Sequence, residues 1–129
     1  MADQKSEVGV DRATQLTKTA AVPPATTIHE AELAAGPSGA VEYGKEIDEL
    51  TAIARRRNGE DIVVRGDDTK ANRARTYRIE AQVGPPSKPQ FPHASKAGPR
   101  ALPHFHQKSR SPKGHAFYET DHRKARKKP

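Results

Sequence analysis

The residues best suited to chemistry lie between Ala101 and Thr120, in a stretch that reads ALPHFHQKSRSPKGHAFYET. It contains three of the six histidines, two of the three phenylalanines and one of the three tyrosines. The unperturbed pKa of histidine is close to neutrality, so two histidines can serve as a general acid and a general base. In this stretch the residue types indicate chemistry rather than solubility alone.

Two strand-like segments, 101–107 and 115–120, flank a polar and basic segment at 108–114, and this arrangement predicts a β-hairpin. Alternation along the first strand places His104 and His106 on one face. Their Cα atoms are then roughly 6–7 Å apart. We therefore expect the two imidazoles to be close enough to act on one substrate.

The two phenylalanines of the hairpin suggest its register. If Phe105 pairs with Phe117, the two rings stack on the inner face. Tyr118 then lies opposite His104 on the outer face, where its hydroxyl donates a hydrogen bond or its ring stacks on a base. A slip of one residue reverses this assignment.

Cations surround the histidine pair in the sequence. They are the candidate substrate-binding residues Arg100, Lys108, Arg110 and Lys113. Such cations stabilise the charge that develops on a phosphate during its transfer. With two histidines they supply the groups for metal-independent RNA cleavage, in which a base takes the 2′-hydroxyl proton and an acid protonates the departing 5′-oxygen.

Two other interpretations of the histidines stay open. In the first interpretation, His104 and His106 are ordinary surface residues. In the second, His104 and His106 bind zinc together with His115 or His93. The sequence has no cysteine, and Glu119 and Asp121 are the carboxylates near the pair. We therefore expect neither a metal site nor a cofactor.

The elements that position this stretch are predicted from hydrophobic spacing and capping residues. The expected fold is α+β, with two to three helices packed on a small antiparallel sheet that ends in the C-terminal hairpin. The predicted elements are helices at 27–35 and 41–57, a strand at 61–65, a helix that Asp67 or Asp68 caps and that continues to Val83, and an extended connection at 85–100.

The chain of 129 residues is long enough for one domain. We predict a flexible leader at 1–26, a single α+β domain at 27–120 and a basic tail at 121–129. The net charge of +7 is uneven, since residues 1–84 carry −2 and residues 85–129 carry +9. The C-terminal third should therefore attract phosphates or an acidic protein.

The N-terminal segment lacks the apolar core of a secretory signal, and no apolar run approaches the ~20 residues of a membrane helix. We therefore expect a protein that is made in the cytoplasm without a signal peptide and that has no membrane partner. If it leaves the cell, a specialised secretion system carries it.

The segments GPRALPHFHQ at Gly98–Gln107 and GHAFYE at Gly114–Glu119 resemble the C-terminal toxin domains of bacterial polymorphic toxins. The predicted layout is also similar to the ribonuclease fold of barnase, EndoU, colicin-type tRNA nucleases and RelE. The resemblance implies a secreted effector that cleaves RNA, with tRNA among its substrates, and that an acidic immunity protein neutralises. It also implies that His104 and His106 are the acid/base pair, with His115 and Tyr118 as supporting groups.

A second function class fits the same composition. In this alternative the chain is a non-catalytic, basic nucleic-acid-binding protein. A disordered tail that contains Arg123, Lys124 and 126–128 then binds phosphate without reading sequence.

Overall fold

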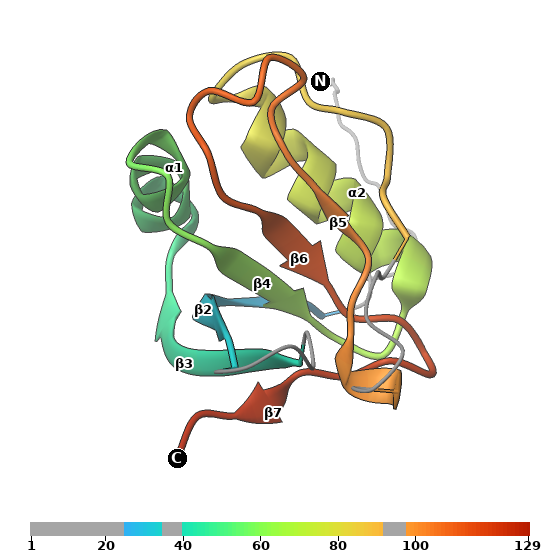
Figure 1. The fold of residues 1–129 in the computed structure, drawn as a ribbon. Helices are drawn as coiled ribbons and strands as arrows, with labels where there is room; N and C mark the ends of the chain where they lie inside the picture. Colours follow the sequence, from blue (N-terminus) through green and yellow to red (C-terminus); the bar gives the residue numbers. More distant parts are fainter. Residues whose placement is uncertain (1–24, 35–39, 92–97) are drawn as a thin grey trace, which may run out of the picture.

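The chain folds into two helices and a six-stranded sheet, as a computed structural model shows for residues 25–34, 40–91 and 98–129 (Figure 1). The order of strands across the sheet is β5-β6-β4-β2-β3-β7. The elements are β2 (Thr27–Leu33), β3 (Val41–Ile47), α1 (Glu49–Arg57), β4 (Ile62–Arg65), α2 (Thr69–Ala81), the 3₁₀ turn η1 (Gly98–Arg100), β5 (His104–Phe105), β6 (Ala116–Tyr118) and β7 (Arg126–Lys127). Most of the predicted leader at 1–26 lies outside the described residues.

The sheet is mixed, which confirms the α+β class but corrects the prediction of a purely antiparallel sheet. Strand β2 pairs antiparallel with β3 and β4, and β5 pairs antiparallel with β6. The pairs β4–β6 and β3–β7 are parallel. The β5–β6 pair is present, but the chain does not end there, because it continues to β7 at the opposite edge of the sheet.

Apolar residues pack on both faces of the sheet. Helices α1 and α2 cover one face, where their apolar side chains meet alternate residues of the strands; this core comprises Ile28, Ala52, Ile53, Ile62, Val64, Ile79, Phe105, Ala116 and Tyr118. The other face packs Ala31, Val41, Val63, Leu102, Phe117 and Ala125. Because Val63 lies between Ile62 and Val64, the β-branched part of β4 is buried on both sides of the sheet.

The predicted helix at 27–35 is wrong, and so is the first half of the predicted helix at 41–57. Both segments are strands that pair with each other, and β2 also pairs with β4. The pairing buries Val41 completely, and this tertiary burial outweighs local helix propensity. Helix α1 begins only after Asp48, whose carboxylate accepts a hydrogen bond of 2.8 Å from the Thr51 backbone N–H.

The predicted strand β4 and the predicted start of α2 are confirmed, whereas α2 ends at Ala81 and not at Val83. Strand β4 occupies the predicted β-branched run, and α2 begins after Asp68. The Asp68 side chain accepts a hydrogen bond of 2.8 Å from the Ala71 backbone N–H, so it satisfies one of the unpaired donors of the first turn.

The basic C-terminal segment is folded and is not the disordered tail of the binding alternative. Residues 126–127 add β7 to the edge of β3. Arg126 forms an ion pair of 2.6 Å with Glu42, and Lys128 forms one of 2.7 Å with Glu32. Two of the tail's cations are therefore engaged by carboxylates of this chain.

Candidate active site

Strands β5 and β6 bring histidines together on the sheet face that lies away from the helices. Their register pairs His104 with Phe117 and Phe105 with Ala116. The ring centroids of His104 and His115 are 4.9 Å apart in an edge-to-face arrangement, and His115 stacks on Phe117 at 5.2 Å. Extended by one residue pair, the same register sets His106 opposite His115.

The observed register is one residue away from the predicted pairing of Phe105 with Phe117. The two phenylalanines consequently lie on opposite faces of the sheet: Phe105 belongs to the core under the helices, and Phe117 to the core on the other face. The slip aligns Phe117 with Val63 of β4 and Phe105 with the helix-facing core. In this register both phenylalanine rings are buried, one in each core. The predicted register would instead place both rings on the same face of the sheet.

The slip moves Tyr118 away from the histidines, so the predicted outer face of His104, His106 and Tyr118 is wrong. Tyr118 lies under the helices, with its ring centroid 5.7 Å from that of Phe105. Burial raises the pKa of its hydroxyl, and the nearby Arg73 guanidinium opposes this rise in pKa. Phe117 holds the position opposite His104 that Tyr118 was expected to hold, and the His115 ring contacts the His104 ring.

Asp61 orients His115 and was not predicted from the sequence as a site residue. Its Oδ1 accepts a hydrogen bond of 2.7 Å from the His115 backbone N–H and lies 3.3 Å from the His115 Nδ1. A carboxylate at Nδ1 holds the proton on that nitrogen, so Nε2 carries the lone pair in neutral His115. Only the parallel pairing of β4 and β6 reveals this contact, because 54 residues separate the two.

His106 is held in the same tautomer by the backbone. Its Nδ1 lies 2.7 Å from the Gln107 carbonyl oxygen, which can only accept, so Nδ1 is the protonated nitrogen. The backbone N–H of His106 donates a hydrogen bond of 3.1 Å to the Ser87 hydroxyl. His106 and His115 thus both present Nε2 as the reactive nitrogen.

The three predicted catalytic histidines differ in accessibility. His104 is only 6% exposed and packs against both His115 and Phe117. His106 is partly buried, and the His115 side chain is 36% exposed. A substrate can therefore reach His106 and His115. The buried His104 ring packs edge-to-face against the His115 ring.

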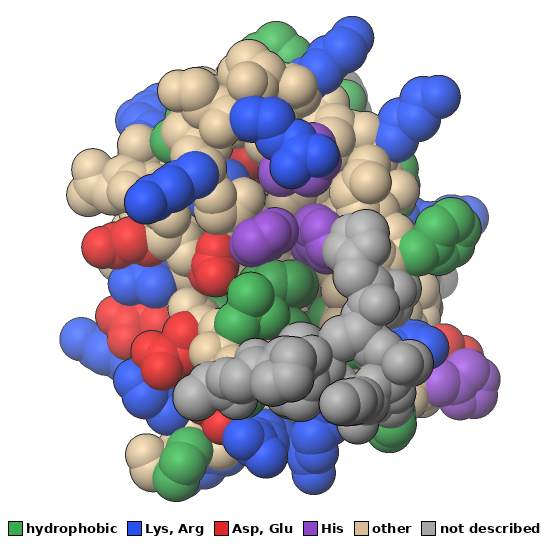
Figure 2. All heavy atoms as spheres, viewed as in Figure 1, with side chains coloured by type: hydrophobic (Ala, Val, Ile, Leu, Met, Phe, Trp, Pro, Cys, Tyr) green, Lys and Arg blue, Asp and Glu red, His purple; other side chains and the backbone are tan. Residues whose placement is uncertain are grey.

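The loop between the two strands carries exposed cations. Lys108, Arg110 and Lys113 are exposed, and Figure 2 shows Lys and Arg side chains beside histidine side chains that gather over β5 and β6. An acidic side chain borders the same group of histidines. Arg100 is exposed in η1, and within the described part of the chain no hydrogen bond or ion pair joins it to the histidines.

A buried ion pair fixes this loop to the helices. Arg56 and Glu80 are fully buried and form two hydrogen bonds, of 2.8 and 2.9 Å. Gln107 donates to Glu80 Oε2 at 2.6 Å, and Arg56 donates to the Lys113 carbonyl at 3.0 Å. The two ends of the loop are therefore tied to one ion pair.

Glycine at position 114 allows the loop to approach α1 closely. Gly114 has a φ of 98°, and a Cβ there would lie 2.7 Å from the Gly59 carbonyl oxygen. The residue directly before His115 must therefore lack a side chain.

In the described parts of the chain, no three or more histidine, aspartate or glutamate side chains are grouped as ligands for a metal ion. His104, His115 and Asp61 are neighbours, since the rings of His104 and His115 are 4.9 Å apart and Asp61 Oδ1 lies 3.3 Å from His115 Nδ1. His93, which the zinc alternative also named, lies outside the described residues.

Comparison of the chain with family models, curated proteins and solved structures finds no match. Of the helices in the described segments, neither is long and apolar enough to cross a membrane.

Proposed function

We propose that the protein is a metal-independent endoribonuclease in which His115 and His106 are the base and the acid. The observation that carries this proposal is the shared tautomer of the two imidazoles. Each has Nδ1 at an oxygen acceptor, Asp61 for His115 and the Gln107 carbonyl for His106, so each offers Nε2 to a substrate. The cations of the connecting loop lie beside them.

In the proposed reaction, Nε2 of His115 takes the proton of a ribose 2′-hydroxyl. The O2′ atom attacks the adjacent phosphorus, and a 2′,3′-cyclic phosphate forms as the bond from phosphorus to O5′ breaks. Protonated His106 gives its proton to O5′, which leaves as a 5′-hydroxyl. The Asp61 carboxylate favours His115 as the base, because it stabilises the imidazolium that forms.

The loop cations have a separate role in this reaction. Lys108, Arg110 and Lys113 neutralise the charge that builds on the non-bridging phosphate oxygens. His104 is a positioning residue, since it is buried against the His115 ring and does not face solvent. Arg100 and Tyr118 have no part in the step.

Purified protein incubated with RNA in excess EDTA tests the proposal. We expect the wild type to cleave, and His115→Ala and His106→Ala each to lower the rate by about 10²-fold or more. Lys45→Ala, which removes an exposed cation from β3, should cleave at the wild-type rate. Intact RNA with the wild type, or full activity in both histidine variants, would refute the proposal.

The proposal extends to a biological role as a toxin that an acidic immunity protein neutralises. Residues 85–129 carry a net charge of +9, which suits a strongly acidic partner. Expression of the wild-type chain alone should arrest growth of a bacterial host, and His115→Ala should not. If the wild-type protein cleaves RNA in the test tube but the host grows normally, the toxin role is refuted and the proposed enzyme activity is not.

A further inference from the structure

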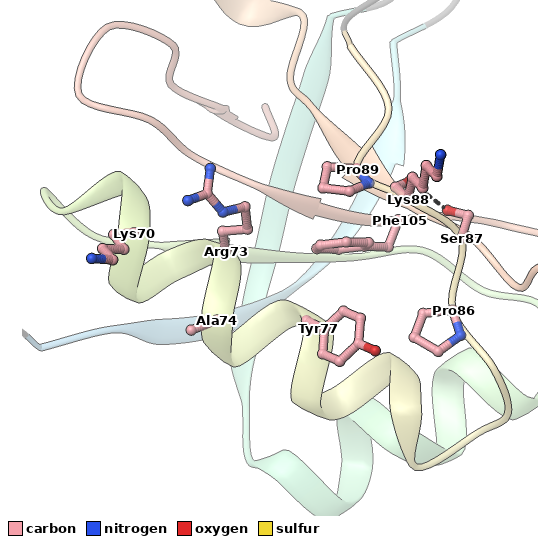
Figure 3. A pocket seen from close by; sticks show the side chains of 9 residues that line it. All are labelled: Lys70, Arg73, Ala74, Tyr77, Pro86, Ser87, Lys88, Pro89 and Phe105. Atoms are coloured by element: carbon pink, nitrogen blue, oxygen red, sulfur yellow. Dashed lines mark hydrogen bonds between the residues drawn. The ribbon is translucent and has the colours of Figure 1, made fainter.

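A groove that contains none of the three histidines of the candidate active site runs between α2 and the extended segment 86–91, and His122 lines one end of it. Two adjoining cavities, of about 650 and 630 Å³, form it and share Arg73, Lys88 and Pro89. Figure 3 shows Lys70, Arg73 and Tyr77 projecting from α2, with the segment from Pro86 to Pro89 beside them. We call this surface the α2 groove.

Basic side chains give the α2 groove a positive charge. Lys70, Arg73 and Lys88 line it, and none of them forms an ion pair with a carboxylate in the described ranges. Among these residues no Asp or Glu lines either cavity. By contrast, Arg75 and Arg78 of the same helix both pair with Glu49. An occupant should therefore be anionic.

The α2 groove also exposes aromatic rings. Tyr77 is 49% exposed, and its ring is held edge-on against Phe105 at a centroid distance of 5.5 Å. Phe91 borders the second cavity and is 84% exposed. Large apolar rings are costly to leave in water, but they are stacking platforms for nucleic-acid bases. An occupant should therefore carry planar groups as well as negative charge.

The α2 groove and the histidines lie on different sides of the sheet. Phe105 and Tyr118 of β5 and β6 contribute to the two cavities, and both point toward the helices. His104 and His115 lie on the other face. The groove is therefore a second site and does not depend on what the histidines do.

We propose that the α2 groove binds a single-stranded RNA segment. Lys70, Arg73 and Lys88 contact its phosphates, and bases stack on Tyr77 and Phe91. The combination of unpaired cations with exposed aromatic rings favours a single strand, because bases in a duplex are stacked on each other and not available. An acidic protein surface would form ion pairs with the cations, but it has no bases to stack on the aromatic rings.

Fluorescence anisotropy with a labelled 2′-O-methyl oligouridylate in EDTA measures this binding. The methyl groups block attack by the 2′-oxygen, so the probe stays intact and the result does not depend on the proposed cleavage. We expect Tyr77→Ala and Phe91→Ala each to weaken binding by about fivefold or more. The exposed apolar residue Leu50 of α1 provides the matched control, and Leu50→Ala should bind like the wild type.

The salt dependence gives a second readout. Three phosphate contacts predict a slope of log K against log salt of about −2, and Lys70→Gln or Lys88→Gln should make it less steep by about 0.7. Lys45→Gln, an exposed cation of β3, should leave it unchanged.

Three results would overturn the proposal. They are no binding by the wild type, unchanged affinity in both aromatic variants, and displacement of the probe by polyglutamate as readily as by unlabelled RNA. The last result would assign the α2 groove to an acidic protein surface.

Discussion

The buried ion pair between Arg56 and Glu80 gives the sharpest test of how the loop of the site is held. The substitution Glu80→Gln keeps the shape of the side chain and removes its charge. One carboxylate oxygen accepts from Arg56 Nε at 2.8 Å, and the other accepts from both Arg56 Nη2 and Gln107 Nε2. In glutamine one of these positions becomes an amide nitrogen that faces another donor.

The expected loss of stability follows from the complete burial of both partners. Leaving one member of a buried ion pair uncompensated destabilises a protein by about 3–5 kcal/mol. With a urea m-value of about 2 kcal/mol/M, the midpoint of unfolding should fall by about 1.5–2.5 M. The matched substitution Glu49→Gln affects a partly exposed carboxylate at 3.4 Å from Arg75 and should lower stability by less than about 1 kcal/mol.

Urea unfolding followed by circular dichroism measures both variants. If Glu80→Gln does not fold at all, the double variant Arg56→Met/Glu80→Leu distinguishes charge from packing. It removes both charges and should be more stable than Glu80→Gln, but it should stay less stable than the wild type, because the Lys113 carbonyl loses its hydrogen bond from Arg56. Equal losses for Glu80→Gln and Glu49→Gln would refute the conclusion that this pair anchors the loop.

Three further predictions concern the site and its surroundings. Gly114→Ala should lower the free energy of unfolding by about 1–3 kcal/mol, because φ is 98° and the new Cβ meets the Gly59 carbonyl; an unchanged urea midpoint would contradict this. Asp61→Asn should lower the rate of RNA cleavage by about 10²-fold without changing the circular dichroism spectrum, whereas an unchanged rate would remove Asp61 from the mechanism. The difference between the phenolate absorbance titrations of wild type and Tyr118→Phe should have a midpoint above pH 10, since burial favours the neutral hydroxyl and raises its pKa. A titration midpoint at or below pH 10 would contradict the burial of Tyr118. The stability that the raised pKa provides is complete below pH 10 and is lost as the pH rises through the folded-state pKa.

Local signals predicted the elements whose structure is decided locally. The β-branched run before Arg65 forms β4, and the Asp68 cap opens α2 where it was expected. Strands β2 and β3 were predicted as helical because residues 27–30 fit a capping box and because Tyr43 and Ile47 continue a helical spacing of apolar residues. Their strand conformation depends on pairing in the sheet, since β2 lies between β3 and β4, and spacing along the chain does not reveal these partners.

The candidate site was predicted in composition but not in geometry. The histidines of the 101–120 stretch do gather, yet His115 and Asp61, rather than Tyr118, complete the group. A one-residue difference in register moves each side chain of a strand to the other face. Because both Phe105 and Phe117 are apolar and both faces of the sheet are buried, the sequence alone could not choose between the two registers.

The chemical ends of the RNA products test the central proposal most directly. RNA is incubated with the wild type in EDTA, and the fragments are analysed by mass spectrometry, beside a substrate with 2′-deoxyribose at the cleaved position. Attack by O2′ with His115 as the base predicts 2′,3′-cyclic phosphate and 5′-hydroxyl ends, and no cleavage at the deoxy position. Fragments with 5′-phosphate ends, or cleavage at the deoxy position, would contradict the mechanism, and intact RNA would contradict the activity itself.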